Sequence, residues 1–124
     1  MSTVKVDIGR KGRGMELPRF SELIKSARAK KNLSVRDLEK HVFSITGVRV
    51  SRTYISFLEI EKRKPTYEVA FALAEALGLE VDLTLASAFQ ARREHDFNRE
   101  VEGLKHFTDK KDPSRYKRVM RYVE

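Results

Sequence analysis

Residues 33–65 read LSVRDLEKHVFSITGVRVSRTYISFLEIEKRKP. Two serines in this stretch are each followed by apolar residues at the three- and four-residue intervals of an amphipathic helix, and serine is a preferred helix cap. The inward residues are Val35, Leu38 and Val42 behind Ser34, and Ile55 and Leu58 behind Ser51. The stretch therefore predicts two short helices in succession. The first has Asp37 in the capping-box position and ends before Gly47.

The flanking sequence has the same helical period. Upstream, apolar residues predict a helix from residue 20 to about residue 31. Downstream, Thr66 is expected to cap a helix that stops at Gly78, and Asp82 to cap a helix that runs at least to Phe89. These five helices make the predicted fold all-α.

The two ends of the chain differ from this central part. Residues 1–19 contain the run Gly-Arg-Lys-Gly-Arg-Gly, which disfavours a helix and predicts a flexible basic arm. Residues 90–124 carry two apolar faces with a break at residues 108–113 between them, which predict one or two extra helices. The faces consist of Phe97, Val101 and Leu104, and of Tyr116, Val119, Met120 and Val123. The predicted organisation is an arm (1–19), a five-helix domain (20–89) and a C-terminal helical extension (90–124).

Composition narrows the class of protein. The 124 residues fit one domain with appendages rather than a large multi-domain enzyme. The sequence has no cysteine, which removes disulfides, thiolate metal sites and thiol nucleophiles. Its most apolar stretch, residues 69–79, is too short to span a bilayer, and we find no signal core near the start. We therefore expect a cytoplasmic protein.

Catalytic and metal motifs are missing from the sequence. His41, His95 and His106 do not have the i, i+4 spacing of paired metal ligands, and no glycine-rich phosphate loop follows a strand. We expect no enzymatic activity, no metal and no cofactor.

The formal net charge of +8 is unevenly distributed. Residues 1–65 carry +9, residues 66–91 carry −4 and residues 92–124 carry +3. Because the basic charge collects on one half of the chain, we favour a functional basic face over scattered surface lysines. A polyanion such as nucleic acid is the partner that this charge favours.

Residues 20–89 resemble the DNA-binding domain of the lambda repressor and Cro superfamily, the XRE-type helix-turn-helix regulators. The resemblance rests on several landmarks in the right order: Arg28, Leu33-Ser34, Leu38, Val50-Ser51, Ile55, Leu58-Glu59, Lys62–Pro65 and residues 73–78. It implies a sequence-specific transcriptional repressor that binds double-stranded DNA as a homodimer. It also implies that the predicted helix at residues 52–60 enters the major groove.

The resemblance assigns base reading to the outer face of that helix, at Arg52, Thr53, Ser56 and Phe57. Arg52 is the best candidate because a guanidinium can donate to guanine O6 and N7 at once. A solvated surface charge is the alternative for Arg52. Phe57 is covered either by thymine methyl groups or by the inserted segment 43–50.

Other residues are assigned by the resemblance to the DNA backbone or to support of the reading helix. The backbone contacts are Ser51, Tyr54, Lys62, Arg63 and Lys64, and a solvated turn is the alternative for the three basic residues. Arg28 and Glu59 match a pair that links the first and third helices and orients the reading helix.

Three features depart from the family pattern. Residues 43–50 stand where the family has a turn of about two residues, so either the second helix gains a turn before Gly47, or a loop projects beside the groove and places Arg49 at a phosphate. Glu39 replaces a small residue, which predicts a looser helix crossing. Glu61 replaces a glycine, and because glutamate is unfavourable at positive φ we expect the third helix to run longer.

The two ends leave alternatives open. Arg10, Lys11 and Arg13 stand among glycines and either enter a narrow minor groove or provide nonspecific charge. The apolar faces of residues 90–124 either form a dimer interface, which we favour, or fold back onto the core. Two other functions also use this fold: an antitoxin that neutralises a partner toxin, and an adaptor that bridges proteins without reading bases.

Overall fold

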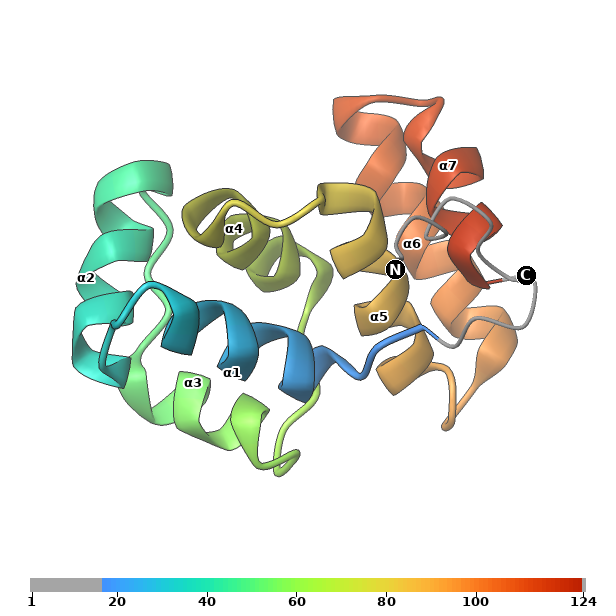
Figure 1. Ribbon diagram of the computed structural model, residues 1–124. Coiled ribbons are helices and arrows are strands. Elements are labelled where there is room, and N and C mark those ends of the chain that lie inside the picture. The colour runs from blue at the N-terminus through green and yellow to red at the C-terminus, as the bar shows by residue number, and fades with distance from the viewer. Residues whose placement is uncertain (1–16, 124) are drawn as a thin grey trace, which may run out of the picture.

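The computed structural model describes residues 17–123, which form seven helices and no strand (Figure 1). The helices are α1 (Phe20–Lys30), α2 (Val35–Thr46), α3 (Arg52–Glu59), α4 (Tyr67–Leu77), α5 (Val81–Arg92), α6 (Phe97–Lys111) and α7 (Arg115–Val123). The all-α prediction is confirmed. The candidate arm residues Arg10, Lys11 and Arg13 lie outside the described residues.

Side-chain caps begin three of the helices where the sequence predicted them. The Asp37 N–H donates to Ser34 Oγ at 3.0 Å, and the Ser34 N–H donates to Asp37 Oδ2 at 3.2 Å, which completes a capping box at the start of α2. Ser51 caps α3 and Thr66 caps α4 through their hydroxyl oxygens. These caps satisfy backbone N–H groups that have no partner inside the helix.

The predicted cap of α5 is wrong. The helix begins at Val81 with Glu80 at the cap position, and Asp82 lies inside the first turn. The Asp82 carboxylate accepts hydrogen bonds from Arg115 at 2.9 Å and from Arg118 at 3.0 Å, both on α7. Two guanidinium partners stabilise a carboxylate more than one backbone N–H does. Sequence periodicity carried no sign of this contact between distant helices.

The core extends through all seven helices. Leu85 and Phe89 of α5 are fully buried at its centre, and α5 packs against α4 on one side and against α6 and α7 on another. Figure 1 shows α6 and α7 at the end of the molecule away from α2 and α3. The C-terminal helices therefore support α5 rather than the α2–α3 region.

The apolar faces that we assigned to a dimer interface are folded back onto this core. Leu104 of α6 and Val119 of α7 are fully buried. The residues packed around them are partly buried: Val101, Tyr116, Met120 and Val123. Phe97 is half-exposed, and its ring meets the edge of Phe89 with centroids 5.8 Å apart. These faces are used inside the chain, and the homodimer itself stays a prediction.

Helix α6 also runs through most of the break predicted at residues 108–113, as far as Lys111. Thr108 is buried, and its hydroxyl donates to the Leu104 carbonyl at 3.0 Å. This bond satisfies a polar group in the core without ending the helix.

A buried carboxylate connects α6 to two other helices. Glu100 is 8% exposed, and its Oε1 accepts hydrogen bonds from the Tyr67 hydroxyl and from Arg92 Nε, each at 2.9 Å. Arg92 also donates to the Pro65 carbonyl at 3.2 Å. Burial raises the pKa of Glu100, but the hydrogen bonds from Arg92 and Tyr67 together lower it by more than burial raises it. The pKa of Glu100 therefore lies below its usual range.

We expect Glu100→Gln to lower the free energy of unfolding by about 1–2 kcal/mol at pH 7, because two hydrogen bonds lose their charged acceptor. A lowered folded-state pKa means that this contribution is full above the unfolded pKa of about 4.3 and is lost as the pH falls through the folded pKa. Urea unfolding of both proteins at pH 7 and pH 3 measures the difference. Glu102→Gln, at an exposed position on the same helix, is the control. An equal difference at both pH values would contradict the role of the charge.

Candidate nucleic-acid interface

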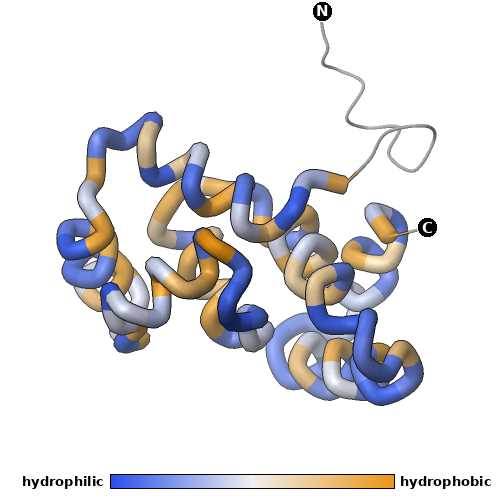
Figure 2. Tube along the Cα trace, turned by 90° about the horizontal axis from the view of Figure 1, so that it is seen from below, coloured by the Kyte–Doolittle hydropathy of each residue, from blue (hydrophilic) through white to orange (hydrophobic). Residues whose placement is uncertain are grey.

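Helix α3 has one buried face and one exposed face. Ile55 and Leu58 are buried, and α3 packs against α1 and α2. Arg52, Thr53 and Ser56 are exposed on the opposite face. Figure 2 views the molecule from below and shows hydrophilic and hydrophobic residues alternating along the helices.

The ion pair predicted between Arg28 and Glu59 is present. Arg28 Nε and Nη2 donate to the two Glu59 oxygens at 2.7 and 2.8 Å, and Arg28 Nη1 donates to the Leu33 carbonyl at 2.8 Å. The side chains are 19% and 7% exposed. The hydrogen bond to Glu59 raises the pKa of Arg28. The pair thus joins the end of α3 to α1 and to the turn before α2.

The inserted segment lengthens α2. The helix continues to Thr46 and ends at Gly47, which has φ of 78° and donates its N–H to the Phe43 carbonyl at 2.8 Å. Residues 48–50 then lead to Ser51. Of the two alternatives, an extra helical turn before Gly47 is therefore the one observed. The positive φ suits glycine, which has no side chain to clash.

Two arginines that flank α3 lie over aromatic rings. The Arg49 guanidinium carbon is 4.4 Å from the centre of the Phe43 ring, and that of Arg63 is 5.8 Å from the centre of the Phe57 ring. A stacked guanidinium keeps its in-plane N–H donors available to another acceptor. Arg63 therefore covers part of the Phe57 ring within the chain, and the contact of Phe57 with thymine stays a prediction.

Arg49 and Phe43 also line a groove beside the start of α3. The groove has a volume of about 380 Å³ and is lined by Glu39, Phe43, Arg49, Val50, Ser51 and Tyr54. It places a guanidinium next to the positive N-terminal end of a helix, a combination that favours an anion.

Tyr54 supports the loop after α3. Its hydroxyl donates to the Lys64 carbonyl at 3.0 Å. The predicted phosphate contact needs the same single proton, because a phosphate oxygen only accepts. In the absence of DNA the hydroxyl therefore positions the Lys62–Lys64 loop, and the phosphate contact of Tyr54 stays a prediction.

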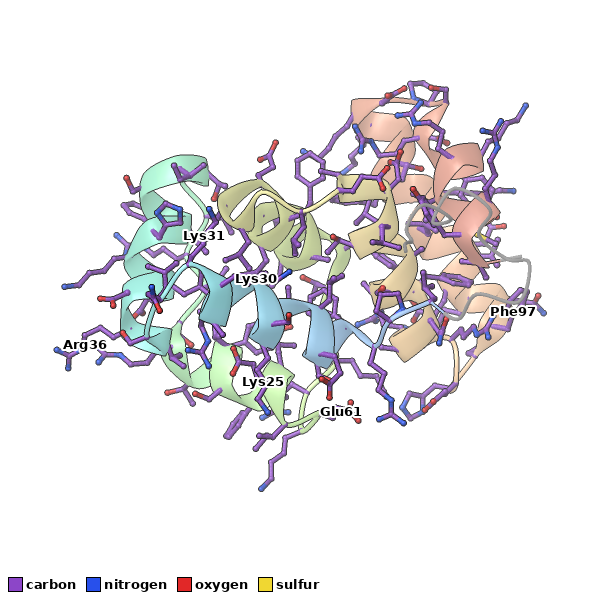
Figure 3. The ribbon with its side chains drawn as sticks, viewed as in Figure 1. Lys25, Lys30, Lys31, Arg36, Glu61 and Phe97 are labelled. Carbon is purple, nitrogen blue, oxygen red and sulfur yellow. The ribbon has the colours of Figure 1, made fainter. Side chains whose placement is uncertain are left out.

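The prediction that α3 would run longer at Glu61 is wrong. The helix ends at Glu59, and Glu61 has φ of 62°. Arg19 Nη1 donates to both Glu61 oxygens at 3.1 Å, and the Ser21 hydroxyl donates to Oε2 at 2.6 Å. The bond from Ser21 and the bonds from Arg19 lower the pKa of Glu61, and they hold the residue in a left-handed conformation that glutamate disfavours. Figure 3 shows Glu61 beneath the start of α1.

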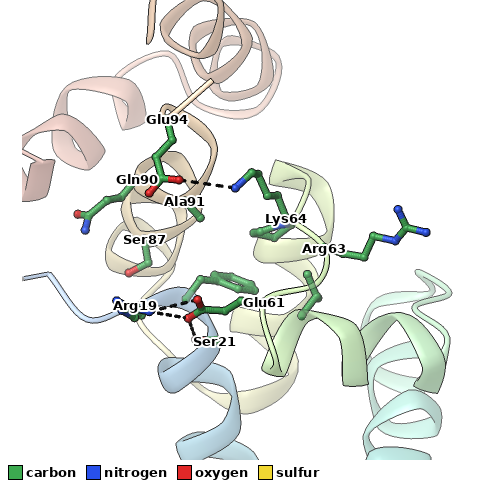
Figure 4. Close-up of a pocket in the computed structure, with 12 residues that line it drawn as sticks. Arg19, Ser21, Glu61, Arg63, Lys64, Ser87, Gln90, Ala91 and Glu94 are labelled. Atoms are coloured by element: carbon green, nitrogen blue, oxygen red, sulfur yellow. Dashed lines mark hydrogen bonds and ion pairs between the residues drawn. The ribbon is translucent and has the colours of Figure 1, made fainter. Parts of the chain in front are cut away.

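A cleft of about 460 Å³ separates this loop from α5. Figure 4 shows Arg63 pointing away from the cleft and Lys64 pointing toward Glu94. Lys64 Nζ is 3.9 Å from Glu94 Oε1. Arg63 therefore faces outward, while Lys64 has a weak acidic partner within the chain.

Arg52, the first residue of α3, also has an acidic partner. Its Nε is 3.3 Å from Oε1 of Glu39 on α2, and the side chains are 50% and 34% exposed. The residue that departs from the family pattern on α2 thus lies beside the candidate base reader.

The comparisons with known proteins agree with this geometry. A helix-turn-helix family model matches residues 24–83, which span most of α1 through the first turn of α5. This segment matches the helix-turn-helix family. Regulators of this family are of the lambda repressor type and bind DNA. The match confirms the resemblance and the broad class of function, a DNA-binding transcription regulator. No curated protein and no solved structure matches the chain.

Sequence reasoning missed three side-chain contacts in or beside this helix-turn-helix unit. Phe43, Arg19 and Glu39 each act through a partner on another element, so their own spacing gave no signal. Opposite charge at Arg19 and Glu61 was visible, but nothing in the sequence showed that the two residues meet.

The described residues show few other candidate sites. Across residues 17–123, no group of three His, Asp or Glu side chains could hold a metal ion, and no helix combines the length and apolar character needed to cross a membrane. His41 Nε2 lies 3.0 Å from the Ala76 carbonyl and links α2 to α4.

Proposed function

We propose that the protein is a sequence-specific transcriptional repressor that reads the major groove of double-stranded DNA with α3. The observation that carries this proposal is the exposed row Arg52, Thr53 and Ser56 on a helix fixed by the Arg28–Glu59 pair. A helix about 10–12 Å wide fits a groove about 12 Å wide. Occupation of the groove can repress transcription by excluding other proteins.

The proposed base contacts differ in their specificity. Arg52 donates to guanine O6 and N7 through the end of its guanidinium. Thr53 and Ser56 carry hydroxyls that donate or accept, so they add contacts that distinguish bases less strictly. Phe57 is partly exposed beside Arg63, and its ring suits a thymine methyl group.

The proposed phosphate contacts lie at both ends of α3. Arg49 and Ser51 precede the helix, and Lys62, Arg63 and Lys64 follow it. Cations at both ends of a helix can contact the two strands that border the groove. Lys64 would exchange its distant Glu94 partner for a phosphate.

Lys62→Ala is expected to weaken binding to all DNA sequences alike. Loss of one phosphate contact should reduce the slope of log K against log salt concentration by about 0.9. Titrations at several salt concentrations measure the slope, with Lys117→Ala on α7 as an exposed control far from α3. An altered base preference, or an unchanged slope, would argue against a phosphate role.

In vitro selection of bound DNA by the purified protein tests the proposed function. We expect a short shared sequence that contains guanine. Two symmetric half-sites, together with a light-scattering mass of two chains, would support the predicted homodimer. A folded protein that enriches no sequence would reject the proposal and favour an adaptor or antitoxin role.

A further inference from the structure

The contact between Glu39 and Arg52 joins the two helices of the helix-turn-helix unit at their exposed side. Glu39 lies on α2 and Arg52 opens α3, and the ion pair is 3.3 Å long. About half of the Arg52 side chain and a third of the Glu39 side chain are exposed. The pair is therefore accessible to a molecule that docks against α3.

The contact with Glu39 is at Nε of Arg52, a half-exposed side chain, so it leaves the two terminal nitrogens to another acceptor. Glu39 Oε1 lies 3.3 Å from Nε, the guanidinium nitrogen that is bonded to the side-chain stem. The terminal pair Nη1 and Nη2 forms a second fork, and this fork matches guanine O6 and N7. One guanidinium can therefore hold Glu39 and guanine together. A side chain held at Nε also loses less conformational entropy when it meets the base.

The negative charge of Glu39 also weakens the binding of DNA of any sequence. Arg49 and Ser51 line the same groove as Glu39, so a phosphate bound there comes close to a carboxylate. The phosphate and the Glu39 carboxylate are both negatively charged, so they repel each other. The repulsion applies to every DNA sequence, whereas the positioning of Arg52 helps only where guanine is present.

We infer that Glu39 is a specificity-determining residue that positions Arg52 for guanine and opposes binding to other DNA. This inference rests on the proposed function, since it assumes that α3 reads bases. It goes further by assigning part of the base specificity to α2. Discrimination of this kind combines an attractive contact with a repulsive one.

A structural role for Glu39 predicts a different outcome. A carboxylate near the start of α3 stabilises the helix through its positive end. Removing such an interaction would lower the melting temperature and weaken all binding alike. A positioning role instead changes the relative affinity for two DNA sequences, which stability alone does not alter.

The test compares wild type, Glu39→Gln and the charge-matched control Glu102→Gln on three DNA duplexes. These are the selected site, the same site with the guanine assigned to Arg52 replaced by adenine, and random DNA. For Glu39→Gln we expect affinity for random DNA to rise about threefold, as for loss of one exposed charge interaction. The preference for guanine over adenine should fall about fivefold to tenfold. Glu102→Gln should change neither.

The outcomes separate this inference from the function on which it rests. If the wild type selects no sequence, the proposed function fails. If it selects a sequence and Glu39→Gln keeps the same guanine preference, the role of Glu39 fails while the function stands. Circular dichroism checks folding, and Glu39→Ala repeats the measurement without an amide. In an Arg52→Ala background, Glu39→Gln should cause no further loss of guanine preference.

Discussion

Arg52→Ala is expected to weaken binding to the selected DNA site by about 10- to 100-fold, the effect of losing a bidentate contact to guanine. Binding to random DNA should weaken by less than about threefold, because one exposed charge contributes little there. The reason is geometric: Arg52 presents its terminal guanidinium nitrogens from the first turn of α3, and the Arg28–Glu59 pair fixes the position of that helix. Fluorescence anisotropy at one fixed salt concentration measures both affinities.

Two further variants control for charge. Arg52→Lys keeps the positive charge but lacks the planar fork, so it should lose nearly as much specificity as alanine. Arg36→Ala removes an exposed arginine that projects from α2 (Figure 3), and it should leave base preference unchanged. Equal weakening of Arg52→Ala on specific and random DNA would identify Arg52 as a phosphate contact.

Helix starts and ends were predictable where the deciding interaction is local. Ser34 and Asp37 are three residues apart, and the bonds between them form within the first turn of α2. Gly47 ends the same helix because of its own backbone freedom. Neither feature depends on what the rest of the chain does.

Errors arose where a distant partner changes the outcome. Asp82 could have capped α5, but α7 brings two arginines to its carboxylate. Glu61 was expected to avoid positive φ, but Arg19 and Ser21 stabilise it there. In each case hydrogen bonds to a distant residue accompany an arrangement that the local preference disfavours. The sequence contained these residues but not their pairing.

The candidate interface shows the same difference between features set by local sequence and features set by distant partners. The resemblance assigned the candidate positions on α3, including Arg52, because they follow a fixed register from Ser51. It could not indicate that Tyr54 bonds the Lys64 carbonyl or that Glu39 meets Arg52, since each contact joins two different elements of the folded chain. Side-chain pairing thus determines which candidate cations have acidic partners within the chain.

Glu59→Ala is expected to lower the free energy of unfolding by about 3 kcal/mol, because it leaves the mostly buried Arg28 guanidinium without its carboxylate. For a chain of this size the melting temperature should fall by roughly 10 °C. Thermal and urea unfolding followed by circular dichroism measure the change. Glu22→Ala, at an exposed acid on α1, is the control and should change stability little.

A double variant separates stability from orientation of α3. Arg28→Met with Glu59→Leu replaces the ion pair by apolar side chains, which should restore most of the lost stability. The bidentate geometry that fixes α3 against α1 is then absent, so affinity for the selected site should remain reduced in a folded protein. Full recovery of both stability and DNA affinity would show that the pair only stabilises the fold. Recovery of stability alone would show that the Arg28–Glu59 geometry sets the angle at which Arg52 meets its base.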